Sequence, residues 1–425
     1  MEVGVKTLGC KVNQYESESL QEELLSYGFD LVDPESETPD FFILNSCSVT
    51  VSAQAKGRKL ARRFRRKNED STIVFTGCYA ELSGDELEEE LPEVDYIVGN
   101  SDKDGIPELL LREAGPTDMP EGQGESHVAF RSRKFLKIQD GCRDWCTFCI
   151  VPHTRPELES MKPEDVIHQI RQLNEENGYG EIVLSGVHLG DYGIDLDRDY
   201  RLTDLVRDLA EEPLDCRVRF SSVEPQDVTR EMIDIIAGSD RFCNHLHLPI
   251  QSGSTPILER MQRNYDREYL YDLAEYCRQK DPDFALNTDL IAGFPGETEE
   301  DHERTKQLAR DICFSRMHVF RYSERPGTAG EKMDDQVHSK VRKRRTKELI
   351  ELGDELETRW ARRFEGQTDS VLVEDREVDG SPIGYTQYYL PARIDGSPAP
   401  NETVSVTLGS FEGDYFEADL IESNE

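Results

Sequence analysis

Three cysteines in the middle of the chain have the spacing of iron–sulfur ligands. Cys142, Cys146 and Cys149 form a Cys-x3-Cys-x2-Cys run. Three thiolates at this spacing can hold three irons of a 4Fe–4S cubane, and the fourth iron is then open to chelate a small molecule. The alternative is a zinc site that uses His153, which follows four residues after the last cysteine. Zinc sites usually need a fourth ligand at finger-like spacing, and no second pair follows, so the spacing favours the cluster.

A second set of cysteines lies in the first eighty residues. Cys10, Cys47 and Cys78 each come shortly after a predicted strand (3–7, 41–44, 73–76) and before a predicted helix (16–27, 51–67, 84–91). Repeated strand–helix units predict a parallel sheet, in which the carboxyl ends of the strands share one edge. We therefore expect the three thiols to converge, as ligands of a second 4Fe–4S cluster with one open iron. Ordinary buried cysteine is the alternative, and it is our interpretation of four others: Cys216, Cys243, Cys277 and Cys313.

The pattern along the chain predicts three domains of α/β class. Residues 1–114 form a parallel sheet with helices, with a further strand at 95–99 and a helix at 106–112, and a Gly- and Pro-rich linker covers 115–126. Residues 127–364 alternate strands with helices and end in a long charged helix at 339–364. The six strand–helix units predict an open, partial (βα)6 barrel, since a typical closed barrel has eight. Residues 366–425 predict a small β-barrel. The expected central strands are 135–139, 182–185, 218–222, 245–248, 286–291 and 317–322; the helices between them are 163–176, 202–209, 230–237, 268–278 and 300–312; the terminal strands are 370–374, 385–389 and 403–408.

The composition predicts a cytoplasmic protein with reduced thiols, in which RNA binding is confined to local basic segments. The chain has no apolar run long enough to span a membrane and no signal-like N-terminus, and clustered cysteines fit reduced, metal-binding thiols. A net charge of −37, from 87 acidic and 50 basic residues, argues against a nucleic-acid partner unless contacts are local. We interpret the acidity as adaptation to a salty cytoplasm. Two basic runs, 56–67 and 340–347, are either solvated helix faces or phosphate contacts. Our candidates for RNA contact are Lys56, Arg58, Arg62, Arg63, Arg66, Arg342 and Arg345.

The whole chain resembles the methylthiotransferase family of radical S-adenosylmethionine (SAM) enzymes. The most specific stretch is TLGCKVNQYES at 7–17, which is similar to the tRNA branch that acts on N6-threonylcarbamoyladenosine. The cysteine loop at 140–152 is similar to the cluster loop of radical SAM enzymes. The N-terminal sheet is then expected to be flavodoxin- or Rossmann-like, and the last sixty residues resemble the TRAM domain, an OB-like RNA-binding barrel. Further matching stretches are LSGVHLG (184–190), SSVEP (221–225), HLHLPIQSGS (245–254), DLIAGFPGET (289–298) and YSERPGT (322–328).

The resemblance implies an activity and its cofactors. The cluster on the central cysteines binds SAM, whose one-electron cleavage yields a radical that abstracts hydrogen from C2 of the modified adenine at tRNA position 37. The N-terminal cluster carries the sulfur that is inserted. The resemblance thus implies two 4Fe–4S clusters, SAM, a tRNA substrate and a flavodoxin- or ferredoxin-type reductant, and we expect a monomer without a membrane partner. The alternatives are the same reaction on an aspartate of a ribosomal protein, and a non-catalytic RNA-binding protein with zinc.

The resemblance also suggests residues that contact the cofactor. Phe148 is expected beside its adenine, and Ser185 and Gly186 near its amino group. Glu224 ends the third strand of the barrel and is expected to bind cofactor or steer substrate. Gln251 and Gly293 follow later strands, whereas His245 and His247 face one side of a strand, as site residues or as core histidines. The family pattern after the cluster loop is changed here, with Pro156, Glu159 and Met161 in place of a glycine and two arginines. The tyrosines of the acidic C-terminal domain are candidates for stacking on RNA: Tyr385, Tyr388 and Tyr389.

Overall fold

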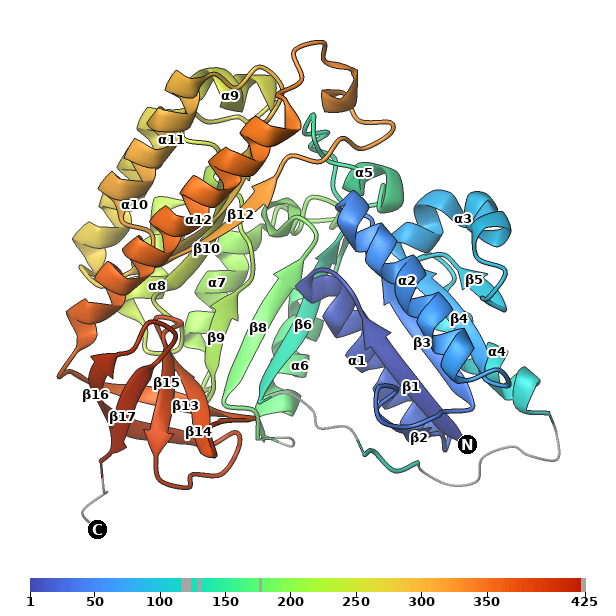
Figure 1. The fold of residues 1–425 in the computed structure, drawn as a ribbon. Coiled ribbons are helices and arrows are strands. Elements are labelled where there is room, and N and C mark those ends of the chain that lie inside the picture. Colours follow the sequence, from blue (N-terminus) through green and yellow to red (C-terminus); the bar gives the residue numbers. More distant parts are fainter. Residues whose placement is uncertain (116–123, 128–131, 176–177, 422–425) are drawn as a thin grey trace.

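The computed structural model describes residues 1–115, 124–127, 132–175 and 178–421 (Figure 1). Its elements form three units along the chain, which we call the N-terminal unit (β1 to α4), the partial barrel (β6 to α12) and the C-terminal barrel (β13 to β17). Most of the linker predicted at 115–126 lies outside the described residues. No helix in the described ranges combines the length and the apolar character that a membrane crossing requires.

The N-terminal unit is a parallel five-stranded sheet in the order β2-β1-β3-β4-β5. Helices α1 and α4 cover one face and α2 and α3 the other, so the central strand β3 is buried along its whole length and is apolar except at its end. The strands are β1 (Glu2–Thr7), β2 (Asp30–Leu31), β3 (Phe41–Ser46), β4 (Thr72–Gly77) and β5 (Tyr96–Val98); the helices are α1 (Lys11–Ser26), α2 (Val51–Lys67), α3 (Cys78–Glu90) and α4 (Ile106–Ala114).

Two helices of this unit begin earlier than the sequence predicted. Helix α1 begins at Lys11 rather than residue 16, and α3 begins at Cys78 rather than residue 84. In both cases a glycine with a positive φ precedes the turn, Gly9 at 111° and Gly77 at 96°. Because glycine tolerates this conformation, the chain passes from strand to helix within a few residues. Cys10 and Cys78 are therefore held at helix starts, whereas Cys47 lies in the short loop between β3 and α2.

The partial barrel is a curved, mainly parallel sheet in two hydrogen-bonded sections. One section has the order β7-β6-β8-β9 and the other β10-β11-β12, and bridges from Val218 to Phe242 and from Ser222 to His247 join them. One apolar core extends across these strands and the helices outside them, which confirms the predicted open α/β barrel. The strands are β6 (Arg133–Asp140), β7 (Glu159–Ser160), β8 (Glu181–Gly186), β9 (Arg217–Phe220), β10 (His245–Gln251), β11 (Ala285–Ala292) and β12 (Arg316–Arg321).

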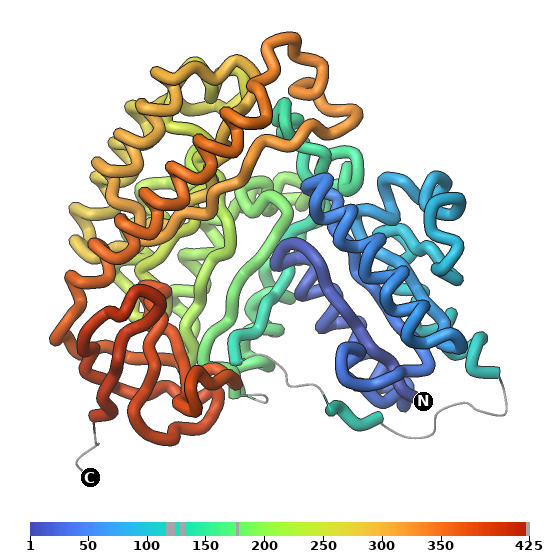
Figure 2. Tube along the Cα trace, viewed as in Figure 1, coloured from blue at the N-terminus to red at the C-terminus, as the bar shows by residue number. Residues whose placement is uncertain are grey.

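The helices of the partial barrel follow its strands and pack outside them. The long last helix, α12, lies along β12 and leads to the C-terminal barrel, as Figure 2 shows in orange. The short helices α5 and α9 were not predicted, because a single turn leaves little periodic signal. The helices are α5 (Val151–Thr154), α6 (Pro163–Glu175), α7 (Leu202–Glu211), α8 (Arg230–Gly238), α9 (Thr255–Arg260), α10 (Arg267–Lys280), α11 (Glu299–Ile312) and α12 (Ser339–Ala361); 3-10 turns occupy Lys103–Gly105, Leu189–Asp191, Pro225–Asp227, Gly330–Lys332 and Arg362–Phe364.

The C-terminal barrel is closed in the order β13-β14-β15-β17-β16. Trp360 in the last turn of α12 and Phe364 in the 3-10 turn after it join its apolar core and so connect it to the partial barrel. The strand predicted at 385–389 is wrong in its second half: β14 ends at Thr386, and a turn with Tyr389 at a φ of 65° follows. The strands are β13 (Thr368–Val378), β14 (Ser381–Thr386), β15 (Pro391–Asp395), β16 (Thr403–Phe411) and β17 (Phe416–Leu420).

Candidate active site

The three N-terminal cysteines converge at the carboxyl edge of their sheet. One side chain, Asn13, connects their loops: its Oδ1 lies 4.0 Å from Cys10 Sγ and 3.9 Å from Cys78 Sγ. Its Nδ2 donates to the carbonyls of Leu8 and Ser46, both at 2.9 Å. Burial raises the pKa of Cys10 and raises that of Cys47 to about 12. Thiolates in such a setting need a compensating positive charge, which metal ligation supplies.

The central cysteines lie in a loop that several backbone contacts hold in place. The Cys142 amide donates to the Arg155 carbonyl at 3.2 Å, and the Cys149 amide donates to the Cys146 carbonyl at 2.9 Å. Burial raises the pKa of Cys149 to about 12. The pKa of Cys146 is raised too, because burial outweighs the opposing effect of Arg263, whose Nη1 donates to the sulfur at 3.2 Å. The loop therefore presents its sulfurs in a fixed arrangement at the end of β6.

The two cysteine sets face one cavity. A cavity of about 430 Å³ is lined by Cys10 and Cys47 from the N-terminal unit and by Cys149 from the partial barrel. Phe148 and Gln251, two of the predicted cofactor contacts, line the same cavity. Cys78 does not line it, but its sulfur shares Asn13 Oδ1 with that of Cys10, and Asn100 Nδ2 lies 3.6 Å from the Cys78 sulfur and 3.4 Å from the Thr154 carbonyl of the partial barrel. Groups carried by the two cysteine sets would therefore be close enough to act on one bound molecule.

The sulfur positions fit a cluster better than a single metal ion. Around one zinc ion, with Zn–S bonds of about 2.3 Å, sulfurs are separated by about 4 Å. Within the described ranges, one group of three side chains has its possible ligand atoms all within 4.8 Å of one another, and it consists of His247, Asp289 and His318. The sulfurs of neither cysteine set lie this close together. A cubane holds its cysteine ligands on separate irons, so it needs this wider spacing.

The other predicted cofactor contacts do not line this cavity. Ser185 and Gly186 end β8, with the Ser185 hydroxyl buried and bonded to the Leu136 carbonyl at 3.3 Å. Glu224 forms an ion pair with Arg263, so it acts on the cluster loop through that arginine in this structure. Gly293 does not line the cavity: a Cβ there would lie 2.5 Å from Arg342 Cγ, so close packing against α12 explains the glycine.

Sequence reasoning missed two residues that contact the central cysteines. His188 Nδ1 lies 3.7 Å from Cys142 Sγ, and its Nε2 lies 3.0 Å from Asp227. Burial opposes its protonation, but Asp191, Asp227 and Cys142 raise the pKa of His188 to about 12, so it is cationic beside the sulfur. The other residue is Arg263. His188 lies in the LSGVHLG stretch that matches the family, so the sequence could have identified it as a site residue. No local pattern around Arg263 indicates that it contacts a cysteine.

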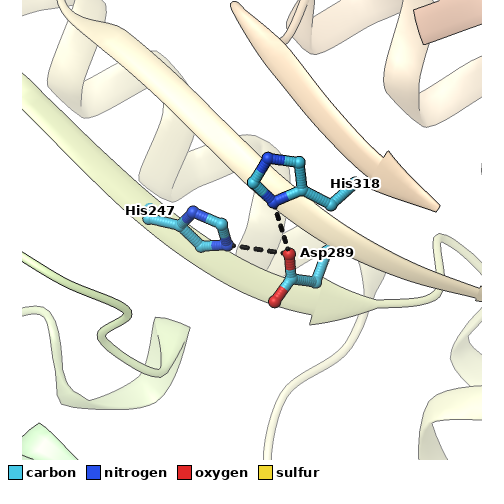
Figure 3. A group of neighbouring side chains, drawn as sticks. All are labelled: His247, Asp289 and His318. Carbon is cyan, nitrogen blue, oxygen red and sulfur yellow. Dashed lines mark hydrogen bonds and ion pairs between the residues drawn. The ribbon is translucent and has the colours of Figure 1, made fainter. Parts of the chain in front are cut away.

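Beyond the cavity, polar side chains continue into the bore of the partial barrel. Asp289 Oδ1 lies 3.0 Å from His247 Nε2 and 3.1 Å from His318 Nδ1 (Figure 3). Burial opposes ionisation, but the two imidazoles lower the pKa of Asp289 well below its usual range. Asp289 also lines the cavity, so it connects the cysteine region with the interior of the barrel.

The predicted RNA-contact residues divide into two groups. On α2, the side chains of Lys56, Arg62, Arg63 and Arg66 are exposed and Arg58 is partly buried beside Tyr79. Val49 and Thr50, directly before α2, line the cavity, so this basic face begins at its edge.

The two arginines predicted on α12 are not available to RNA, and this part of the prediction is wrong. Arg342 and Arg345 are buried against the partial barrel. Arg342 pairs with Glu324 at 2.8 Å, and Arg345 pairs with Glu297 at 2.7 Å. The sequence shows the charges of these arginines but not their ion-pair partners, because the partners lie in distant segments of the chain.

Two of the three tyrosines predicted to stack on RNA contact arginines of the partial barrel. Tyr389 lies under two guanidinium groups, with Arg133 at 5.1 Å and Arg219 at 5.0 Å from its ring centre. Tyr385 lies 4.5 Å from Arg133 in the same way. Arginines of this chain therefore occupy the Tyr385 and Tyr389 rings in place of the predicted stacking on RNA, whereas the Tyr388 ring lies 5.0 Å from that of Phe364 and its hydroxyl 3.5 Å from Asp281.

Comparison with known proteins agrees with this fold and site. Residues 136–309 match the model of the Radical SAM superfamily, and residues 2–99 match that of the uncharacterized protein family UPF0004. Among solved structures, the radical SAM methyltransferase TsrM from Kitasatospora setae shares the fold, with a TM-score of 0.54, 12% identity and coverage of 75% of this chain and 74% of that one. The partial barrel with its Cys-x3-Cys-x2-Cys loop thus defines a radical SAM enzyme, which uses SAM and an iron–sulfur cluster.

Curated proteins with higher sequence identity to this chain define its family within the radical SAM enzymes. The chain is 38% identical to the threonylcarbamoyladenosine tRNA methylthiotransferase of Bacillus subtilis, over 93% of this chain and 90% of that protein. It is 35% identical to its counterpart in Thermotoga maritima, over 93% and 92%. It is 37% identical to the tRNA-2-methylthio-N6-dimethylallyladenosine synthase of Carboxydothermus hydrogenoformans, over 87% of both chains. The chain belongs to the methylthiotransferase family of radical SAM enzymes.

Proposed function

We propose that the protein transfers a methylthio group to C2 of N6-threonylcarbamoyladenosine at position 37 of tRNA. The observation that carries this proposal is the shared cavity, which Cys10 and Cys47 line from one side and Cys149 from the other. Two relatives that cover most of the chain are named for this reaction. A flavodoxin- or ferredoxin-type reductant and a monomeric state belong to the same proposal.

The chain's own residues would hold two 4Fe–4S clusters, one on Cys142, Cys146 and Cys149 and one on Cys10, Cys47 and Cys78. When bound, the first cluster with SAM would supply the radical chemistry, and the second would supply sulfur. The cationic His188 and Arg263 stabilise thiolates in the central loop, since each places a nitrogen within 3.7 Å of a cysteine sulfur. Phe148 and Gln251 would shape the cavity that the two sets share.

The position of the cavity supports exclusion of water and a buried reacting base. Its lining includes Ile150, Ile291 and Phe320, which surround the polar groups with apolar surface. A base that reacts there must leave its stack, as other enzymes that modify bases require. The exposed cations of α2 begin at the cavity's edge and would contact the phosphates around such a base.

Two measurements test the proposal. Anaerobically purified protein should contain about eight irons and a matching amount of sulfide per chain, as two cubanes require. Colourless protein with zinc would support the non-catalytic RNA-binding alternative. Nucleoside mass spectrometry of tRNA from cells with and without the gene should then show loss of the 2-methylthio form of threonylcarbamoyladenosine. An unchanged tRNA profile together with loss of methylthioaspartate in a ribosomal protein would refute the tRNA assignment.

A further inference from the structure

Lys11 is a cation without an ion-pair partner among the described residues. It is the first residue of α1 and directly follows Cys10, which lines the cavity. Helix α1 packs against β6 and β8 of the partial barrel. The groups whose charges act on the Lys11 ammonium include Tyr389, Arg219, Arg133 and Asp289, so the side chain lies where all three units meet.

The neighbouring arginines already have carboxylate partners. Arg133 pairs with Glu374 at 2.6 Å. Arg219 makes a bidentate pair with Glu181, at 2.7 and 3.0 Å. Asp289, the carboxylate that acts on Lys11, is shared by His247 and His318. Among the described residues of this region, Lys11 is therefore the side-chain amine that no carboxylate pairs with. A charge removed from water without a partner is costly, and an anionic ligand would offset that cost.

A second, independent feature of the same region also indicates a polar ligand. His245 is only 2% exposed, and neither of its ring nitrogens has a hydrogen-bond partner. Its ring lies 5.3 Å from that of Tyr389, and the Lys11 charge acts on it. Buried polar groups are almost always hydrogen-bonded in folded proteins. A polar, anionic ligand in this region would satisfy both the unbonded imidazole of His245 and the unpaired amine of Lys11, whose charge acts on that imidazole.

We propose that Lys11 binds a carboxylate carried by the substrate base and thereby selects N6-threonylcarbamoyladenosine over N6-dimethylallyladenosine. This inference rests on the proposed function and adds the residue that determines its specificity. The threonylcarbamoyl group ends in a carboxylate and also carries a hydroxyl and a urea, whereas the dimethylallyl group is apolar. Relatives named for the two substrates are 38% and 37% identical to this chain, so overall similarity does not distinguish them. In this proposal, the Lys11 side chain distinguishes the two substrates by their charge.

The test compares acid and ester forms of one substrate. Anticodon stem-loop RNAs carry threonylcarbamoyladenosine at position 37 as the free acid or as its methyl ester, which lacks the negative charge. The reconstituted enzyme and its Lys11→Gln and Lys11→Arg variants are assayed for kcat/KM and, by fluorescence anisotropy, for RNA affinity. Lys280→Gln is the matched control, since Lys280 lies at the far end of α10 and pairs with Asp234 at 2.8 Å.

We expect the wild-type enzyme to prefer the acid over the ester. Lys11→Gln should lower kcat/KM on the acid by about 10- to 100-fold, as loss of a charged hydrogen bond does, and change the ester value by less than about 3-fold. The affinity of Lys11→Gln for RNA should likewise fall more for the acid than for the ester. Lys11→Arg should retain most of the preference, and Lys280→Gln should match the wild type.

Several outcomes would overturn the inference. One is a wild-type acid-to-ester ratio near one, which needs no variant and so does not depend on how Lys11→Gln folds. Another is an equal loss on both RNAs in Lys11→Gln, which would mean that the residue only supports the cysteine beside it; iron content of the variant would show this directly. If the wild type modifies a dimethylallyladenosine stem-loop and neither threonylcarbamoyl RNA, the proposed function fails irrespective of Lys11.

Discussion

Arg155 connects the two cysteine sets, and its replacement by methionine should loosen the interface between the N-terminal unit and the partial barrel. Its guanidinium lies 2.8 Å from Glu16 on α1 and 2.7 Å from Asp140 at the end of β6. Its carbonyl accepts the amide of Cys142. Arg155 is 7% exposed, and Lys103 and Lys137 complete the ion network around the same carboxylates. Arg155→Met keeps the length and apolar stem of the side chain but removes its charge.

The expected loss of stability in Arg155→Met depends on which cations still surround Glu16. Removing one partner of a buried ion pair typically costs about 3–5 kcal/mol. Here Lys103 and Lys137 still face Glu16, so we expect the free energy of unfolding to fall by about 2–3 kcal/mol. Burial opposes ionisation of Glu16, but Lys103 and Arg155 lower its pKa well below the usual range. The stabilisation is therefore present above the ordinary glutamate pKa and is lost as pH falls, and the cost of Arg155→Met should shrink in acid.

Denaturant unfolding of the anaerobic protein measures this cost. Arg171→Met is the matched control, because Arg171 donates to Glu212 at 2.8 Å in an exposed pair whose loss should cost about 0–1 kcal/mol. Adding Glu16→Gln to Arg155→Met should restore part of the stability, since it removes the carboxylate left short of a cation. An Arg155→Met protein no less stable than Arg171→Met would refute the reasoning.

Three further predictions concern sulfur transfer, RNA binding and pH. Cys10→Ala should abolish methylthiolation but retain 5′-deoxyadenosine release from SAM and about four irons per chain; loss of that release would contradict separate roles for the two cysteine sets. Arg62→Glu with Arg66→Glu should weaken stem-loop RNA binding by about tenfold or more and flatten its dependence on salt concentration, and an unchanged salt slope would remove α2 from the RNA surface. Asp369→Asn should stabilise the protein by about 1–3 kcal/mol at pH 7.5 and by almost nothing at pH 4, as unfolding at both values will show. Burial raises the pKa of Asp369 to about 6, so the stability that its protonated form contributes is lost as pH rises through that value.

Much of the fold could be predicted because its elements carry strong local patterns. The bounds of α2 at 51–67 agree with the prediction, as does the start of α6 at Pro163, since helix periodicity and a proline in the first turn are signals within the element itself. Errors lie where an element is short or where its end depends on distant packing. The turn at Tyr389 interrupts a predicted strand because its ring is held by Arg133 and Arg219 of another unit.

The amino-acid sequence alone determined the chemistry that is available: two cysteine sets, one closely spaced and one repeated after three strands, and a basic helix in an acidic chain. Spacing along one segment and the order of strand and helix are local properties, so they can be read without coordinates. Only the tertiary structure decided which charges are paired and which face the cavity. It buried Arg342 and Arg345 against acidic partners, placed His188 and Arg263 beside the sulfurs, and left Lys11 without a described partner. Those outcomes depend on how three units pack together, because each ion pair joins residues that no local pattern relates.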